Sequence, residues 1–192
     1  MSEESNAELI RKLVREAKVL GLPYRSDLPL TVRSILSAAD ADQRLLDVDE
    51  VQALCRISGV EPYGLLSLQT EASSLVKEAR EQLLLNQPDL VRPGGALYPE
   101  SRAEACWRDC YHFLRVSFYA VAAGAKNFTD PEGIQGLRRL YEALGVPIPG
   151  LLFALNSLRS LATATYSETS SQHDVELLDS ALAELQLQLS KF

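Results

Sequence analysis

One segment of the chain, residues 101–124, combines a thiol, a carboxylate and guanidinium groups in a pattern typical of a buried helix. At about 100° per residue, Arg102, Cys106 and Asp109 fall on one face of such a helix. Cys110 lies one turn beyond Cys106 and is rotated by only about 40°. An acid, a base and a nucleophile on one face predict a partly polar pocket that can seat a ligand.

The other face of this helix carries residues suited to burial. They are Trp107, Tyr111, Leu114, Val121 and Ala122. A helix that is apolar on one side and polar on the other can be embedded in a core while it presents a pocket. The rest of the chain is therefore expected to pack around this segment.

The chemistry of Cys106 has two interpretations. Most isolated cysteines on helices are small buried hydrophobes, whereas Arg102 one turn earlier would favour a reactive thiolate. His112 is rotated by about 120° from Cys106, so it is not placed to act as a base for the thiol. With no acid–base or metal-ligand constellation in the sequence, we expect the protein not to be an enzyme.

The composition restricts the class of protein. A chain of 192 residues with 46% hydrophobic content suits one globular domain with a sizeable core. A net charge of −7 argues against nucleic-acid binding, which requires clustered cations. The three cysteines do not suggest a disulfide framework. An acidic start, MSEESN, and the lack of a long apolar run predict a cytoplasmic protein that does not insert into a membrane.

Helical periodicity runs through the whole chain, and no useful strand pattern is present, which predicts an all-α fold. A capping box from Ser5 to Glu8 predicts the start of the first helix. Asp47 or Asp49 is placed to cap the second of two short helices. The expected helices cover residues 5–20, two segments within 31–57, 63–85, 101–124, 131–144, 150–166 and 175–189.

Several separated motifs together resemble the phycobiliprotein family, the allophycocyanin and phycocyanin subunits of cyanobacterial light-harvesting antennae. The resemblance covers roughly Thr31 to Leu182 and rests on motifs in the correct order. These are ADADQR at 39–44, QPDLVRPGG at 87–95 with Tyr98, RAEACWRD at 102–109, FLR at 113–115, YAVAAG at 119–124, and GLR at 136–138 with Tyr141, Leu144, Gly145 and Pro147.

The resemblance implies a globin-like fold with two pre-globin helices, here preceded by an extra N-terminal helix. The expected organisation is an N-terminal helical extension at 1–30 and a globin-like phycobiliprotein domain at 31–192. Typical family members begin near the equivalent of Thr31. The extension is interpreted either as a helix packed on its own core, which we favour slightly, or as an arm that binds a linker or assembly protein.

The resemblance also implies a cofactor, a phycocyanobilin-type linear tetrapyrrole (bilin), and assigns residues to it. Cys106 would form a thioether with ring A, and Asp109 would accept hydrogen bonds from the middle pyrrole nitrogens. Arg102 and Arg108 would pair with the propionates, although Arg108 lies about 200° around the helix from Cys106. Further candidates for lining the pocket are Tyr141 and Tyr98.

Assembly with other phycobiliprotein subunits, or as a homodimer, is a further implication of the resemblance. Asp40, Arg44 and Arg115 stand at family interface positions, and we expect Asp40 and Arg115 to form an ion pair across a subunit interface. The implied location is cytoplasmic, peripheral on the thylakoid membrane as part of a phycobilisome.

Some positions depart from the family pattern. They are Leu45, Ala96, Ala125, Arg139, the second pocket cysteine Cys110 and the extension. The main hypothesis is a light-harvesting subunit that carries one bilin on Cys106. The alternative is a divergent paralogue used for bilin sensing, carriage or antenna assembly, with or without a chromophore.

Overall fold

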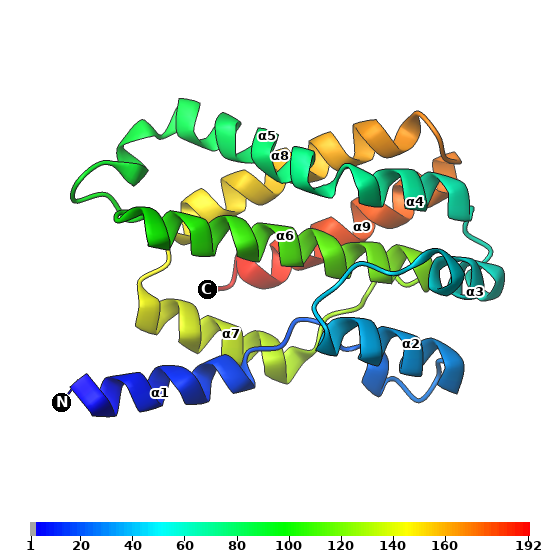
Figure 1. The fold of residues 1–192 in the computed structure, drawn as a ribbon, viewed down its shortest axis with the longest axis horizontal. Helices are drawn as coiled ribbons and strands as arrows, with labels where there is room; N and C mark the ends of the chain where they lie inside the picture. Colours follow the sequence, from blue (N-terminus) through cyan, green and yellow to red (C-terminus); the bar gives the residue numbers. More distant parts are fainter. Residues whose placement is uncertain (1–2) are drawn as a thin grey trace.

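The computed structural model describes residues 3–192, with side chains from residue 6 onward, and this part of the chain is built from helices (Figure 1). The all-α prediction is therefore confirmed. The α-helices are α1 (Glu3–Glu16), α2 (Leu30–Ala41), α3 (Val48–Ser58), α4 (Pro62–Thr70), α5 (Ala72–Asn86), α6 (Glu100–Ala122), α7 (Pro131–Leu144), α8 (Ile148–Ser167) and α9 (Gln172–Leu189). Two short 3₁₀ helices, η1 (Leu22–Tyr24) and η2 (Pro88–Val91), lie in the connections.

Helix α6 runs through the middle of the molecule, with α5 on one side of it and α7 on the other (Figure 1). Every residue from Phe113 to Ala122 is buried, so this half of the helix is enclosed on all sides. The expected burial of Trp107, Leu114, Val121 and Ala122 is confirmed, while Tyr111 is only half-buried. Enclosure on all sides fixes the rotation of α6, and with it the direction of every side chain on its N-terminal half.

Local signals place several helix ends correctly. Asp47 caps α3, because its carboxylate accepts from Glu50 N–H at 2.8 Å while Glu50 accepts from Asp47 N–H, which completes a capping box. Gly145 ends α7 in the left-handed region with φ of 64°, where glycine avoids the Cβ penalty. The Asp47 cap separates α3 from α2, and Gly145 begins the turn that leads into α8.

Several predictions of helix boundaries were wrong, among them the end of the first helix, which was expected at residue 20 and lies at Glu16. The single helix expected over 63–85 is divided at Glu71, whose N–H bonds to Leu68 O in a tightened turn. Apolar periodicity continues across the break because both halves pack inward, so the pattern alone does not reveal it. At the N-terminus, α1 begins at Glu3, which places Ser5 inside the helix instead of at its cap.

The N-terminal extension packs on the body of the protein. Gly21 N–H donates to Phe128 O at 2.7 Å, and Asp130 N–H donates to Val19 O at 2.8 Å, which ties the segment after α1 to the start of α7. Leu13 in α1 is buried at 6% exposure. This arrangement agrees with the interpretation of a helix packed on its own core.

Two glycines on α7 allow this close approach. A Cβ at Gly133 would lie 2.2 Å from Lys18 O, and one at Gly136 would lie 2.5 Å from Glu16 O. Both distances are far below van der Waals contact, so any side chain here would push the extension away. Arg139 of α7 adds an ion pair to Glu16 at 3.0 Å.

Within the described residues, no helix has the combination of length and apolar character that crossing a bilayer requires.

If α1 is part of the core, then Leu13→Ala should lower the free energy of unfolding by about 2–4 kcal/mol, the usual cost of a large-to-small change at a buried site. Leu9→Ala is the matched control, since Leu9 lies on the same helix and is 41% exposed; it should cost less than about 1 kcal/mol. Urea unfolding followed by circular dichroism measures both. Equal and small losses would show that α1 detaches from the body.

Candidate functional site

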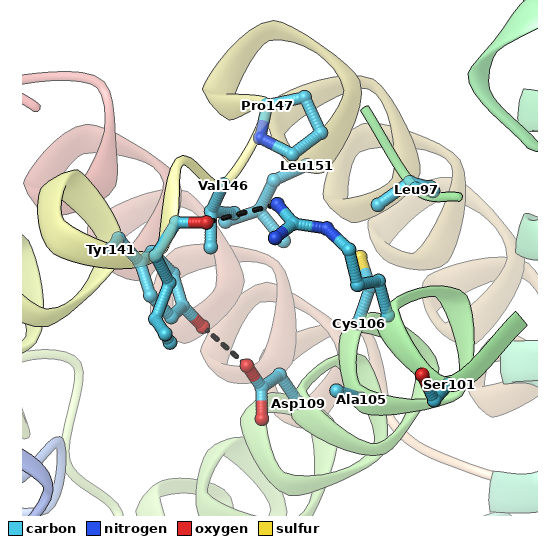
Figure 2. A pocket seen from close by; sticks show the side chains of 11 residues that line it. Leu97, Ser101, Ala105, Cys106, Asp109, Tyr141, Val146, Pro147 and Leu151 are labelled. Atoms are coloured by element: carbon cyan, nitrogen blue, oxygen red, sulfur yellow. Dashed lines mark hydrogen bonds between the residues drawn. The ribbon is translucent and has the colours of Figure 1, made fainter. Parts of the chain in front are cut away.

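A cavity of about 190 Å³ lies between the N-terminal half of α6 and the turn from α7 to α8 (Figure 2). Most of its wall is apolar, and four side chains of α6 that can interact with a ligand line it: Ser101, Arg102, Cys106 and Asp109. The lining residues are Leu97, Ser101, Arg102, Ala105, Cys106, Asp109, Tyr141, Leu144, Val146, Pro147 and Leu151. The structure therefore brings Arg102, Cys106, Asp109 and Tyr141 together around one cavity.

Cys106 presents a half-buried thiol to this cavity. The pKa of Cys106 is lowered, chiefly by its interaction with the neighbouring Cys110 thiol, while burial acts in the opposite direction. Cys110 itself is 2% exposed and is absent from the cavity wall, and its pKa is raised by the same interaction and by burial. Of the two thiols, Cys106 is thus both the accessible one and the better nucleophile.

The expectation that Arg102 favours the Cys106 thiolate is not supported, because the guanidinium is directed elsewhere. Arg102 Nε donates to Ala96 O at 3.1 Å, and Nη2 donates to Leu144 O at 2.9 Å and to Gly145 O at 3.1 Å. The last two carbonyls lie at the C-terminus of α7, where they lack partners within the helix and the helix dipole favours a cation. Arg102 therefore joins the start of α6 to the end of α7 across one side of the cavity.

Asp109 and Tyr141 face each other across the inner end of the cavity (Figure 2). The Tyr141 hydroxyl donates to Asp109 Oδ2 at 2.8 Å. Burial raises the pKa of Asp109, against smaller lowering effects of the Tyr141 hydrogen bond and the charge of Arg108. Among the described residues only one of the two carboxylate oxygens has a hydrogen-bond partner, so Oδ1 is free to accept from a ligand.

Arg108 and Tyr98 lie outside this site. Arg108 is exposed and is not part of the cavity wall, as its rotation around α6 indicated. Tyr98 is 48% exposed, and its neighbour Leu97 lines the cavity instead. The prediction that Tyr98 lines the pocket was wrong, because side-chain direction in a loop without regular periodicity cannot be read from spacing.

The ion pair expected across a subunit interface is found within one chain. Arg115 Nη2 lies 2.8 Å from Asp40 Oδ1, and Arg115 Nη1 donates to the Tyr119 hydroxyl at 2.7 Å. Arg115 is only 4% exposed, because α2 and the α2–α3 connection cover it in the same molecule. Arg44 is likewise engaged internally, in a bidentate pair with Glu50 at 2.6 and 2.8 Å.

Sequence patterns did not indicate most of the apolar residues of the cavity wall, nor the residues that contact Arg115 and Arg44 within the chain. Val146, Pro147 and Leu151 line the cavity, yet Pro147 was read only as part of the turn after a helix. Tyr119 and Glu50 complete the ion pairs described above. Helical spacing gives the face of a single element, whereas these contacts depend on how separate elements meet.

This set of side chains fits a largely apolar ligand that has N–H donors and an anionic group. Cys106 offers a nucleophile, Asp109 an acceptor in an apolar wall, and Arg102 a cation. Within the described residues, no group of three or more histidine, cysteine, aspartate or glutamate side chains is arranged to hold a metal ion.

Comparison with known proteins gives consistent matches. A family described as "Phycobilisome protein" matches residues 34–185. Allophycocyanin subunit beta-18 of Nostoc sp. is 40% identical over 95 residues, 50% of this chain and 56% of that protein. The allophycocyanin alpha chain of Cyanophora paradoxa is 29% identical over 163 residues, 83% of this chain and 100% of that protein. That of Arthrospira platensis is 32% identical over 143 residues, 73% of this chain and 88% of that protein.

Asp109 should make the stability of the ligand-free protein depend on pH. Its pKa is raised in the folded state, so above the ordinary carboxyl pKa of about 3.9 the folded chain holds more protons than the unfolded chain. Stability attributable to this group then falls as pH rises from about 4 through the raised pKa. Asp109→Asn keeps an acceptor for Tyr141 and should abolish that fall, which leaves the variant more stable than the wild type at pH 7.

Chemical unfolding at a series of pH values tests this expectation. Glu104→Gln is a suitable control, because Glu104 is an exposed carboxylate on the same helix. If the free energy of unfolding changes with pH in the same way for the wild type and for Asp109→Asn, then burial does not destabilise the charged form of Asp109.

The Asp40–Arg115 pair should stabilise the isolated chain. Asp40→Ala leaves the buried Arg115 guanidinium without its carboxylate, and we expect a loss of about 1–3 kcal/mol. Asp42→Ala, at an exposed position on the same segment, should cost less than about 0.5 kcal/mol. Because the pair lies within one chain, the loss should be the same at every protein concentration. A loss that appears only where the protein associates would restore the interpretation of a pair between subunits.

Proposed function

Because the chain belongs to the phycobilisome protein family, we propose that it is a light-harvesting subunit that carries one linear tetrapyrrole, of the phycocyanobilin type, on Cys106. The observation that carries this proposal is the cavity of α6, where the accessible thiol of Cys106, the Asp109 carboxyl and the Arg102 guanidinium share one wall. A linear tetrapyrrole in this site would supply the conjugated system that absorbs visible light.

Cys106 would hold the pigment through a thioether. In this addition, the Cys106 sulfur bonds to one carbon of a side-chain double bond on ring A, and the thiol proton ends on the other carbon. Atoms and electrons balance without an oxidant or reductant. The lowered pKa of Cys106 supports this role, since the thiolate is the reacting form.

Asp109 would hold the pyrrole N–H groups through its free carboxylate oxygen. Tyr141 fixes the orientation of the carboxyl group by donating to Oδ2 at 2.8 Å. Tyr141 is itself 3% exposed and cannot easily move away. A carboxylate held this way favours the protonated, cationic form of the pigment and restricts its torsion, so that excitation is not lost through internal rotation.

Arg102 is the cation for one propionate. Its Nε and Nη2 are bonded to backbone carbonyls, whereas Nη1 has no hydrogen-bond partner among the described residues. The carbonyl contacts hold the guanidinium over the cavity, and Nη1 remains able to donate. A role for Arg108 in binding a propionate is proposed from the family resemblance alone, because Arg108 is exposed and lies outside the cavity wall.

Assembly with other phycobiliprotein subunits is part of the proposal. It is supported by large apolar side chains that are more than half exposed along η1, α2, α3 and α4: Tyr24, Leu30, Val48, Ile57 and Tyr63. Such a surface is typical of a protein interface. The proposed location is the soluble phycobilisome, peripheral to the thylakoid membrane, and contact with a linker through the extension stays a prediction.

Replacement of the two thiols one at a time tests the site of attachment. Cys106→Ala should abolish covalent pigment in protein purified from its native host, because the cavity then has no nucleophile. Cys110→Ala should keep it, because Cys110 is buried away from the cavity. Zinc-enhanced fluorescence on a denaturing gel reports the covalent pigment. Pigment retained by Cys106→Ala would refute the assignment of this thiol, and a colourless wild type would favour a chromophore-free paralogue.

A further inference from the structure

A second cavity, of about 300 Å³, lies beyond the hydrogen bond between Asp109 and Tyr141. Both of these residues line both cavities. The second cavity is lined by residues of α6 and α7, by Asp40 and Gln43 at the end of α2, and by an N-terminal wall formed by the end of α1 and the residues after it. The N-terminal contribution is Val14, Arg15, Ala17, Lys18, Val19 and Leu20.

The N-terminal wall contributes two cations, Arg15 and Lys18. Among the described residues, neither Arg15 nor Lys18 is within ion-pair distance of an acidic group. The amine of Lys18 instead lies 5.7 Å from the centre of the Tyr24 ring. The family match begins at residue 34, so both cations belong to the part of this chain that precedes it.

The other ionisable groups in the second cavity do not satisfy these cations. Asp40 is engaged by Arg115 at 2.8 Å. Asp109 accepts a hydrogen bond from the Tyr141 hydroxyl at 2.8 Å, and His112 Nδ1 accepts one from Arg115 Nε at 3.3 Å. Arg15 and Lys18 are therefore the cations of this cavity that have no carboxylate partner among the described residues.

We propose that Arg15 and Lys18 bind a carboxylate arm of the linear tetrapyrrole, so that the N-terminal extension completes the pigment site. This inference rests on the proposed function. It assigns to the extension a binding role toward the pigment, instead of a role limited to packing or to contact with a partner protein.

The dimensions of the two cavities support this assignment. The first, at about 190 Å³, is smaller than the roughly 300–1,000 Å³ usual for sites of drug-sized ligands. Asp109 and Tyr141 line both cavities, so a ligand that fills the first cavity and displaces or passes these two side chains reaches the second. Its other end then lies beside the extension.

The arrangement of charges also supports a role for Arg15 and Lys18 in binding a carboxylate of the pigment. The wall of the first cavity holds one guanidinium, Arg102, and Arg108 is not part of it. A pigment with two propionates therefore finds only one cation there. Arg15 and Lys18 supply positive charge at the far side of Asp109, where a second carboxylate needs it.

The backbone of the extension is held firmly enough for this role. The glycines at 133 and 136 let the segment from Glu16 to Lys18 lie directly on α7. Lys18 N–H also donates to Gly133 O at 3.3 Å. This packing keeps the Cα atoms of both cations at the cavity, so that only their side chains must be ordered when a carboxylate binds.

The test measures reversible pigment binding in a Cys106→Ala background, where no thioether can form. Biliverdin, with two propionates, is compared with biliverdin dimethyl ester, which lacks both charges. Arg15→Gln/Lys18→Gln should weaken biliverdin binding roughly tenfold or more, the effect of about 1.4 kcal/mol. Binding of the ester should change by less than about twofold.

A matched control removes the same number of positive charges from the N-terminal extension. Arg11→Gln/Lys12→Gln alters two exposed cations of α1 that do not line either cavity, and it should leave the affinity for both pigments unchanged. Melting temperatures of both double variants show that the extension stays folded.

The outcomes separate this inference from the proposed function. Suppose that both pigments bind, and that the Arg15→Gln/Lys18→Gln variant either loses the same affinity for both or loses affinity for neither. The proposed role of the extension is then wrong, while the proposed pigment site is still supported. If neither pigment binds and the wild type from its host is also colourless, the proposed function fails, and this inference fails with it.

Discussion

The hydrogen bond from Tyr141 to Asp109, at 2.8 Å, joins α7 to α6 at the wall between the two cavities. The carboxyl group lies among apolar residues, where an unpaired charge is costly, and Tyr141 is the one side-chain partner that it has among the described residues. Burial raises the pKa of Asp109, so the ligand-free site holds a destabilised group. Ionisable groups that destabilise the ligand-free protein are expected at binding sites, where function requires them despite their cost in stability.

The position of α7 is set from its other side by the N-terminal extension. Close backbone contact at Gly133 and Gly136 allows α1 and the following segment to cover α7. Tyr141 follows two turns later on the same helix, so a shift of α7 would carry the hydroxyl away from Asp109. The extension therefore acts on the site in two ways, by supporting α7 and by providing a wall of the second cavity.

Ion pairs inside the chain fix the pre-globin helices on α6. Arg115 is buried on α6 and reaches Asp40 on α2, while its second amino group meets the Tyr119 hydroxyl. Tyr119 in turn donates to Arg44 O in the α2–α3 connection. A buried guanidinium with several partners specifies one arrangement, because each alternative leaves a buried donor unsatisfied. This network leaves the exposed apolar side chains of α2, α3 and α4 as the surface available for assembly.

The helical class, many helix ends and the polar face of α6 follow from local sequence, because they depend on periodicity and on caps within a few residues. Asp47, Gly145 and the face shared by Arg102, Cys106 and Asp109 are of this kind. Motif order also indicated the family and gave Tyr141 as a pocket residue.

The tertiary structure alone decided the partners of those residues. Arg102 meets Leu144 O, Arg115 meets Asp40 in the same chain, and Leu97 takes the place in the cavity that was expected for Tyr98. It also decided that Arg15 and Lys18 line the same cavity as Asp109. Each of these contacts joins elements distant in the chain, and their relative positions follow from the packing of whole helices, which no local spacing encodes.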